Sequence, residues 1–124
     1  MQFQALPLRG SNSLSFQLVR ENQINPFEGK RGGSGQERIL TYTFNSDVFK
    51  SLLLDMQRGA TSHKWGIPKG IPMEYVLQAG AEEKVDGVWR CKRGRSQNHL
   101  FDCETMQIVL AYLNRVYRNE FLTR

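Results

Sequence analysis

The stretch Trp89-Arg90-Cys91-Lys92-Arg93-Gly94-Arg95-Ser96-Gln97-Asn98-His99-Leu100-Phe101-Asp102-Cys103-Glu104 sets the pattern for the rest of the chain. Four basic residues lead through a polar turn to Asp102: Arg90, Lys92, Arg93 and Arg95. A long amphipathic pattern follows and predicts a core helix over residues 100–118. In the sequence, a run of basic residues therefore precedes an acidic residue at the start of the predicted helix.

The apolar stripe of the predicted helix is centred on Asp102. At about 100° per residue, four apolar residues lie within about 40° of Asp102: Met106, Val109, Leu113 and Val116. The opposite side is predicted to face water and carries Glu104, Gln107, Asn114, Arg115 and Arg118. A carboxylate in line with a buried stripe needs a partner, because an unpaired buried charge is strongly disfavoured.

Two interpretations of Asp102 fit this pattern. As a first-turn or capping acid it would be stabilised by the helix N-terminus, an effect of about 0.5–2 kcal/mol. As a metal-binding acid at the mouth of a sheet it would offer the oxygen ligand that hard divalent cations take. The two are compatible, since Asn98 is suited to cap the helix and leave Asp102 to bind a metal.

The run from Trp89 to Ala111, with Asn98-His99-Leu100-Phe101-Asp102-Cys103-Glu104 at its centre, resembles the end of the nuclease domain of phage terminase large subunits, especially the lambda-like family. In that family an Asn-acid/His-Leu/Ala-x-Asp-Cys-x motif opens the last core helix of an RNase H-like fold. The resemblance implies an α/β chain with a partial RNase H-like fold, in which short strands pack against a long C-terminal helix.

The resemblance also implies chemistry. The Asp of the motif is the last of a set of metal-binding acids, so the catalytic and metal-binding role falls on Asp102, with Mg²⁺ or Mn²⁺ as the cofactor. The intact enzyme cuts concatemeric double-stranded viral DNA in the host cytoplasm and drives it into a procapsid. The expected partners are that DNA, the portal and the small terminase subunit.

Other segments extend the resemblance. Arg9-Gly10 corresponds to a Lys-Gly pair, and Asp47 with Lys50 corresponds to a "strand, Asp, Lys, helix" segment. The candidate DNA-binding residues are Arg90, Lys92, Arg93, Arg95, Lys50 and Arg9. The alternatives are that Lys50 is a solvated helix lysine and that the basic strand is an edge that blocks aggregation.

Length and composition set the limits. The chain has 124 residues, which suits one modest domain, here taken as residues 1–124. Its apolar content is 40% and its net charge is +5, which favours an acidic partner such as nucleic acid. No membrane span or signal peptide is expected, and Cys91 and Cys103 are expected to be reduced. These features predict a cytoplasmic protein.

The remaining elements follow from local patterns. Strands are predicted over residues 3–10, with Pro7 favouring an edge or a strand end, and over residues 38–44, 63–68 and 88–93, with Val88 and Cys91 near the core in the last. Helices are predicted over residues 47–58 and 73–77. Residues 11–37 are predicted to form a weak hairpin or a flexible polar and Gly-rich excursion. His63 is interpreted as a structural or surface residue.

Cleavage by a pair of metal ions needs several converging carboxylates. The other acids are expected on loops or wet helix faces: Glu21, Glu28, Glu37, Asp47, Asp55, Glu74, Glu82, Glu83, Asp86, Glu104 and Glu120. No P-loop is present. The leading hypothesis is therefore the C-terminal portion of a terminase nuclease domain that is inactive alone. The alternatives are a non-catalytic module that binds DNA or a packaging partner, and a small basic α/β protein without a link to packaging.

Overall fold

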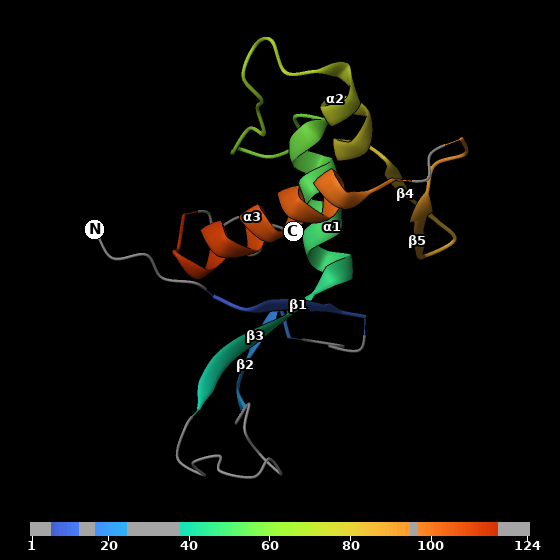
Figure 1. The fold of residues 1–124 in the computed structure, drawn as a ribbon. Coiled ribbons are helices and arrows are strands. Elements are labelled where there is room, and N and C mark those ends of the chain that lie inside the picture. Colours follow the sequence, from blue (N-terminus) through green and yellow to red (C-terminus); the bar gives the residue numbers. More distant parts are fainter. Residues whose placement is uncertain (1–5, 13–16, 25–37, 95–96, 117–124) are drawn as a thin grey trace, which may run out of the picture. The chain divides into compact units, whose positions relative to one another are not determined.

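The computed structural model of the chain describes residues 6–12, 17–24, 38–94 and 97–116, which divide into one unit within residues 1–46 and a second within residues 47–124. Three strands make up the sheet of the first unit: β1 (Leu8–Ser11), β2 (Val19–Ile24) and β3 (Ile39–Asn45). Their order is β1-β3-β2, with β1 parallel and β2 antiparallel to β3 (Figure 1). The mixed α/β class expected from the sequence is confirmed.

Strand β1 is an edge strand, as Pro7 predicts. The carbonyl of Pro7 accepts a hydrogen bond from the Tyr42 amide at 3.0 Å, just before the ladder begins. Gly10 is needed in this strand because a Cβ at that position would lie 2.5 Å from Ser46 Oγ and 3.2 Å from the Phe44 ring. The glycine therefore permits a close approach between β1 and the end of β3.

Part of residues 11–37 is a strand. Residues 19–24 form β2, which pairs with β3 over six positions from Val19 opposite Phe44 to Ile24 opposite Ile39. This pairing matches the hairpin alternative for that part of the segment. Residues 13–16 and 25–37, and with them most of the predicted Gly-rich excursion, lie outside the described residues.

Two helices form the core of the second unit. Helix α1 (Ser46–Gln57) buries Phe49, Leu52, Leu53 and Met56. It is followed two residues later by Gly59, whose φ of +73° suits the turn after a helix end. Helix α3 (His99–Leu113) lies against it through the edge-on contact of Phe49 with Tyr112, whose ring centroids are 5.6 Å apart. The short helix α2 (Met73–Ala79) packs on α3.

A hairpin completes the second unit. Strand β4 (Glu82–Val85) pairs antiparallel with β5 (Val88–Cys91). Asp86 and Gly87 connect them with φ values of +53° and +80°, the backbone that a two-residue hairpin turn requires. The Lys92 amide donates to the Ala81 carbonyl at 2.7 Å and continues the ladder past its last pair.

Helix α3 differs from the prediction in its length and in the face that it buries. It ends at Leu113 rather than at residue 118, and Asn114 Nδ2 donates to the Leu110 carbonyl at this end. The buried face consists of Phe101, Glu104, Thr105, Ile108 and Val109. Because this face is rotated from the predicted stripe by about one residue step, or about 100°, Met106 is exposed and Asp102 lies at the border. Val116 lies beyond the end of α3 and is also exposed.

Two further predictions about the second unit are wrong. Residues 63–68 contain no strand and form an irregular connection. Val88 is 64% exposed, whereas Trp89, on the other face of β5, is partly buried. Within the described parts of the chain, no helix has the length and apolar character needed to cross a bilayer.

Candidate functional site

Two carboxyl groups meet where β4 begins and α3 begins. Asp102 is partly buried in the first turn of α3, and Glu82, at the start of β4, is only 4% exposed. Burial raises the pKa of Asp102, and the negative charge of Glu82 and a hydrogen bond to it raise that pKa further. The sequence predicted that Asp102 would be aimed at a buried location, and its partner there is a second acid.

Lys50 of α1 supplies the countercharge. Its Nζ lies 2.8 Å from Glu82 Oε1, and its side chain is only 18% exposed. Asn98 Nδ2 donates to Glu82 Oε2 at 3.2 Å, so both oxygens of Glu82 are engaged. The positive charges of Lys50 and His99 also act to lower the pKa of Asp102. The positive charge of Lys50 therefore acts on two carboxyl groups, those of Glu82 and Asp102, in a partly buried location.

Aromatic rings lie close to the amine of Lys50. Lys50 Nζ lies 5.9 Å from the ring centroids of both Trp89 and Phe101, within the range of cation–π attraction. The Trp89 and Phe101 rings are themselves 6.0 Å apart, and Phe101 is fully buried. These contacts hold the Lys50 side chain against the first turn of α3, which carries Asp102.

A second ion pair ties the hairpin to α1. Asp47, in the first turn of α1, accepts hydrogen bonds from Lys84 Nζ at 2.6 Å and from Trp89 Nε1 at 2.9 Å. The hydrogen bond from Lys84 is the main reason that the pKa of Asp47 is lowered. Because side chains alternate along a strand, Glu82 and Lys84 share the face of β4 that meets α1.

We call the group formed by Asp102, Glu82, Lys50 and Asn98 the acid cluster.

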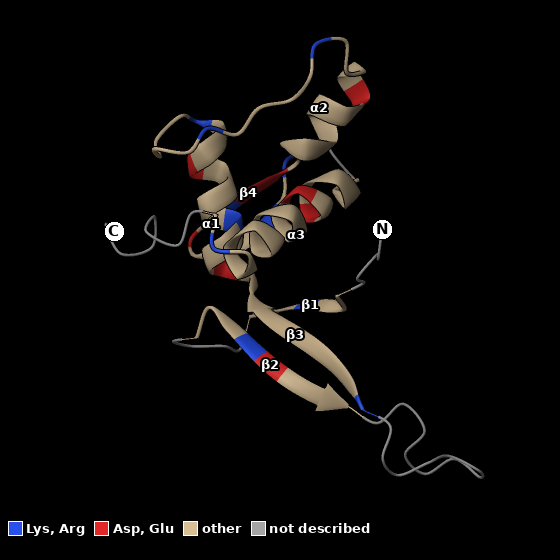
Figure 2. Cartoon of the chain, turned by 90° about the vertical axis from the view of Figure 1, so that its left-hand side faces the viewer, with Lys and Arg blue, Asp and Glu red and all other residues tan. Residues whose placement is uncertain are grey.

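Most of the predicted basic residues are not part of the acid cluster. Arg90 is exposed and lies 3.9 Å from Glu83, its partner across the hairpin. Lys92 and Arg93 follow β5, the first partly buried and the second exposed. Arg95 lies outside the described residues, and Arg9 belongs to the other unit, where it is exposed on β1. Figure 2 shows the acidic start of β4 beside α3.

Three expectations about the acid cluster need correction. Glu82 is buried and ion-paired rather than on a wet surface. The interpretation of Lys50 as a solvated lysine is wrong, since Glu82 and two rings surround its amine. Asn98 stands at the N-cap position but makes no capping hydrogen bond through its side chain. The sequence did contain one signal for the position of Glu82, namely the Asp86-Gly87 turn. A hairpin at this turn places Glu82 and Lys84 on the same face of its first strand.

Comparison with protein families gives an independent finding. The model of the family described as "terminase large subunit gpA, endonuclease domain" matches residues 3–121. No curated protein and no solved structure gives a match. The family match covers both units, including all four residues of the acid cluster. The chain therefore belongs to the family of terminase large subunit endonuclease domains, a family of viral DNA-packaging nucleases.

Proposed function

We propose that this chain takes part in metal-dependent endonucleolytic cleavage of concatemeric double-stranded viral DNA in the host cytoplasm, with Asp102 as a metal-binding and catalytic carboxylate. The observation that carries the proposal is the pairing of Asp102 with Glu82 beside Lys50. Two acids kept together in a partly buried place raise the electrostatic cost of the folded state, which is common at functional sites. A divalent cation would offset that cost.

The donor set fits a hard cation. Mg²⁺ is commonly held by one or two carboxylates, with water and substrate phosphate as the other ligands, and Asp102 with Glu82 provides such a pair. Terminase nuclease domains generally depend on a metal, and the bound ion supplies Lewis-acid polarisation of the phosphate and an activated water. Asp102 would be the main ligand, since both oxygens of Glu82 are engaged by Lys50 and Asn98.

The basic residues beside β5 would contact the DNA backbone. Arg90 and Arg93 are exposed and close in sequence, with Lys92 between them. Lysine and arginine contacts to phosphates supply most of the affinity of sequence-independent binding. Lys50 would reach a phosphate only after leaving Glu82, so a role in positioning the acids suits its contacts better. The portal and the small terminase subunit remain proposed partners of the intact enzyme.

A second candidate is a non-catalytic module that binds DNA or a packaging partner. It is favoured by one observation: among the described residues, no three His, Cys, Asp or Glu side chains are grouped in a way that would hold a metal ion. Cleavage by two metal ions needs more carboxylates than the acid cluster contains. We therefore expect that the chain alone binds a metal weakly and cleaves DNA poorly.

Metal binding by Asp102 tests the proposal. In the purified chain, Mn²⁺ is expected to broaden amide NMR signals near residues 82 and 102 first, and Asp102→Asn is expected to weaken Mn²⁺ binding at least about tenfold, the loss of one strong ligand. Asp102→Asn should fold at least as well as the wild type, because it removes one of two adjacent negative charges.

The matched control is Asp86→Asn, which removes an exposed acid from a turn that tolerates asparagine. Its Mn²⁺ affinity should equal that of the wild type. Equal Mn²⁺ affinity of the Asp102→Asn variant and the wild type would refute the metal role of Asp102. Robust Mg²⁺-dependent nicking by the chain alone, lost in Asp102→Asn, would show that further acids are not needed.

DNA binding is tested separately. Changing Arg90, Lys92 and Arg93 to glutamine should weaken binding to a 30-base-pair duplex, as measured by fluorescence anisotropy. Each lost phosphate contact should also reduce the slope of log affinity against log salt by about 0.9. The control replaces Lys64 and Lys69, which are exposed in the connection after α1. If the first variant keeps its affinity and salt slope, the chain is better described as a basic α/β protein that does not use β5 for DNA.

A further inference from the structure

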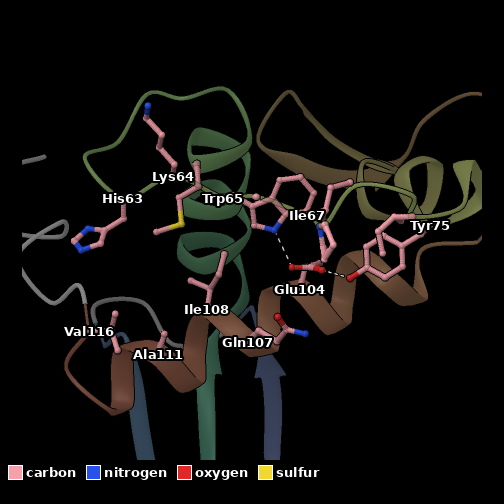
Figure 3. Close-up of a pocket in the computed structure, with 14 residues that line it drawn as sticks. His63, Lys64, Trp65, Ile67, Tyr75, Glu104, Gln107, Ile108, Ala111 and Val116 are labelled. Carbon is pink, nitrogen blue, oxygen red and sulfur yellow. Dashed lines mark hydrogen bonds between the residues drawn. The ribbon is translucent and has the colours of Figure 1, made fainter.

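A cavity of about 460 Å³ lies in the second unit, and none of the described residues that line it belongs to the acid cluster. It is bordered by the irregular connection after α1, by α2 and by α3 (Figure 3). This volume is in the range of sites that hold small molecules or side chains of a partner. Its walls are largely apolar, with Met56, Ile67, Ile71, Ile108, Ala111 and Val116 among the lining residues.

Glu104 is the acid in the wall of this cavity. It is only 6% exposed, although the sequence placed it on the wet side of α3. Its Oε2 accepts a hydrogen bond from Trp65 Nε1 at 2.8 Å, and its Oε1 accepts one from the Tyr75 hydroxyl (Figure 3). Both donors are neutral, and among the described residues no lysine, arginine or histidine forms an ion pair with Glu104.

Among the described residues the Glu104 carboxylate is held by neutral donors and has no ion-pair partner, and burying a carboxylate without a cation is costly. The hydrogen bond to Glu104 raises the pKa of Tyr75 to about 12, so the phenol remains a donor over the physiological range. The cavity thus offers a carboxyl group, an indole, a phenol ring and apolar walls. Ammonium and guanidinium groups bind to aromatic faces and carboxylates, and their methylene stems pack on apolar surface.

We propose that this cavity binds the side chain of an arginine or lysine presented by a partner protein, with the cationic group beside Glu104 and the methylene stem along the apolar wall. A partner protein suits the site better than a free amine, because the cavity is larger than one small cation. Val116, which lines it, is also 60% exposed. Exposed apolar side chains at the rim of such a pocket give a partner surface further contact.

The test uses Trp65 as the reporter. Trp65 and Trp89 are the two tryptophans of the chain, so Trp89→Phe leaves fluorescence from Trp65 alone. In this background, a capped Leu-Ala-Arg-Ala-Leu peptide should change the emission saturably. The same peptide with citrulline, the neutral isostere of arginine, should bind at least about tenfold more weakly, as expected for a charge-assisted contact. Butylguanidinium should bind at least about tenfold more weakly than the arginine peptide, since it lacks the flanking residues.

Variants identify the group that recognises the cation. Glu104→Gln should abolish the preference for arginine over citrulline, whereas Glu74→Gln, an exposed acid next to Tyr75 on α2, should leave it unchanged. Should Glu104→Gln fail to fold, Tyr75→Phe provides a second measurement. It removes one neutral donor and keeps the carboxylate, so the arginine peptide should bind at least as tightly as before.

Two outcomes would overturn the proposal. If no saturable binding is observed, the contacts of Trp65 and Tyr75 with Glu104 have only a structural role. Equal affinity for butylguanidinium and the arginine peptide would assign the cavity to a free organic cation.

Discussion

Lys50→Met is expected to lower the free energy of unfolding at neutral pH by about 3–5 kcal/mol, the usual result of removing one partner of a buried ion pair. Methionine keeps most of the length and packing of the lysine stem but leaves Glu82 without its cation. Because Glu82 is only 4% exposed and Asp102 adds a second negative charge beside it, water cannot readily replace the amine. Chemical denaturation followed by circular dichroism measures the loss.

The loss should depend on pH. The folded-state pKa of Asp102 is raised above its ordinary 3.8, so its contribution to stability is complete below that value and is lost as the pH rises through the raised pKa. Lys50 opposes this shift, and Lys50→Met should therefore raise the pKa of Asp102 further. The cost of the substitution should become smaller as the pH falls from 7 through the raised pKa of Asp102, since protonation of Asp102 removes one of the two charges.

A double-mutant cycle separates the charge effect from packing. Combining Lys50→Met with Glu82→Gln should recover part of the loss, because no unpaired charge then remains at Glu82. Lys69→Met, at an exposed position in the connection after α1, should change stability by less than about 0.5 kcal/mol. Purely additive effects of the two cluster substitutions would contradict the arrangement of the acid cluster.

Phe101→Ala is expected to destabilise the second unit by about 3–5 kcal/mol, the range for truncating a buried aromatic residue. Phe101 is fully buried, contacts the Trp89 ring and lies under the amine of Lys50. Its removal leaves a cavity beneath the first turn of α3, and the position of Asp102 depends on that turn. Denaturation measures the stability, and Mn²⁺ titration of the folded fraction should show weaker binding.

Phe101→Leu is the matched variant, since it keeps most of the apolar volume and removes the ring. It should cost less than half of the alanine substitution, with the remainder reflecting lost contacts to Trp89 and Lys50. A loss below about 1 kcal/mol for Phe101→Ala would mean that the ring is not an essential part of the core.

The local pattern of the sequence predicted the elements that depend on near neighbours. The alternation in residues 38–44 appears as β3, the apolar positions of residues 47–58 as α1, and the basic stretch from Trp89 leads to α3. Gly59, with a positive φ, follows the end of α1. In β3 and α1 the apolar residues follow a single strand or helix period along most of the element, and the faces that they define are the ones that pack in the structure. The terminase family, inferred from the motif around Asp102, is confirmed by the match over residues 3–121.

The face of α3 was predicted incorrectly because the sequence around it supports two stripes. Apolar side chains occur both near Asp102 and near Phe101, so periodicity alone does not decide between them. Packing of Phe101, Ile108 and Val109 in the second unit selects the latter. That rotation buries Glu104, which an isolated helix would leave in water, and its charge is accommodated by the donors Trp65 and Tyr75.

The sequence by itself determined the family, the strand at residues 38–44 and the helices α1 and α3, and it singled out Asp102 as the candidate acid. Only the tertiary structure decided which groups surround that acid. Glu82 and Lys50 are 32 residues apart, and no local pattern encodes a contact between a strand and a helix at that separation. Their meeting with Asp102 results from the burial of α1, β4 and α3 against one another, where a charge that leaves water must find a partner.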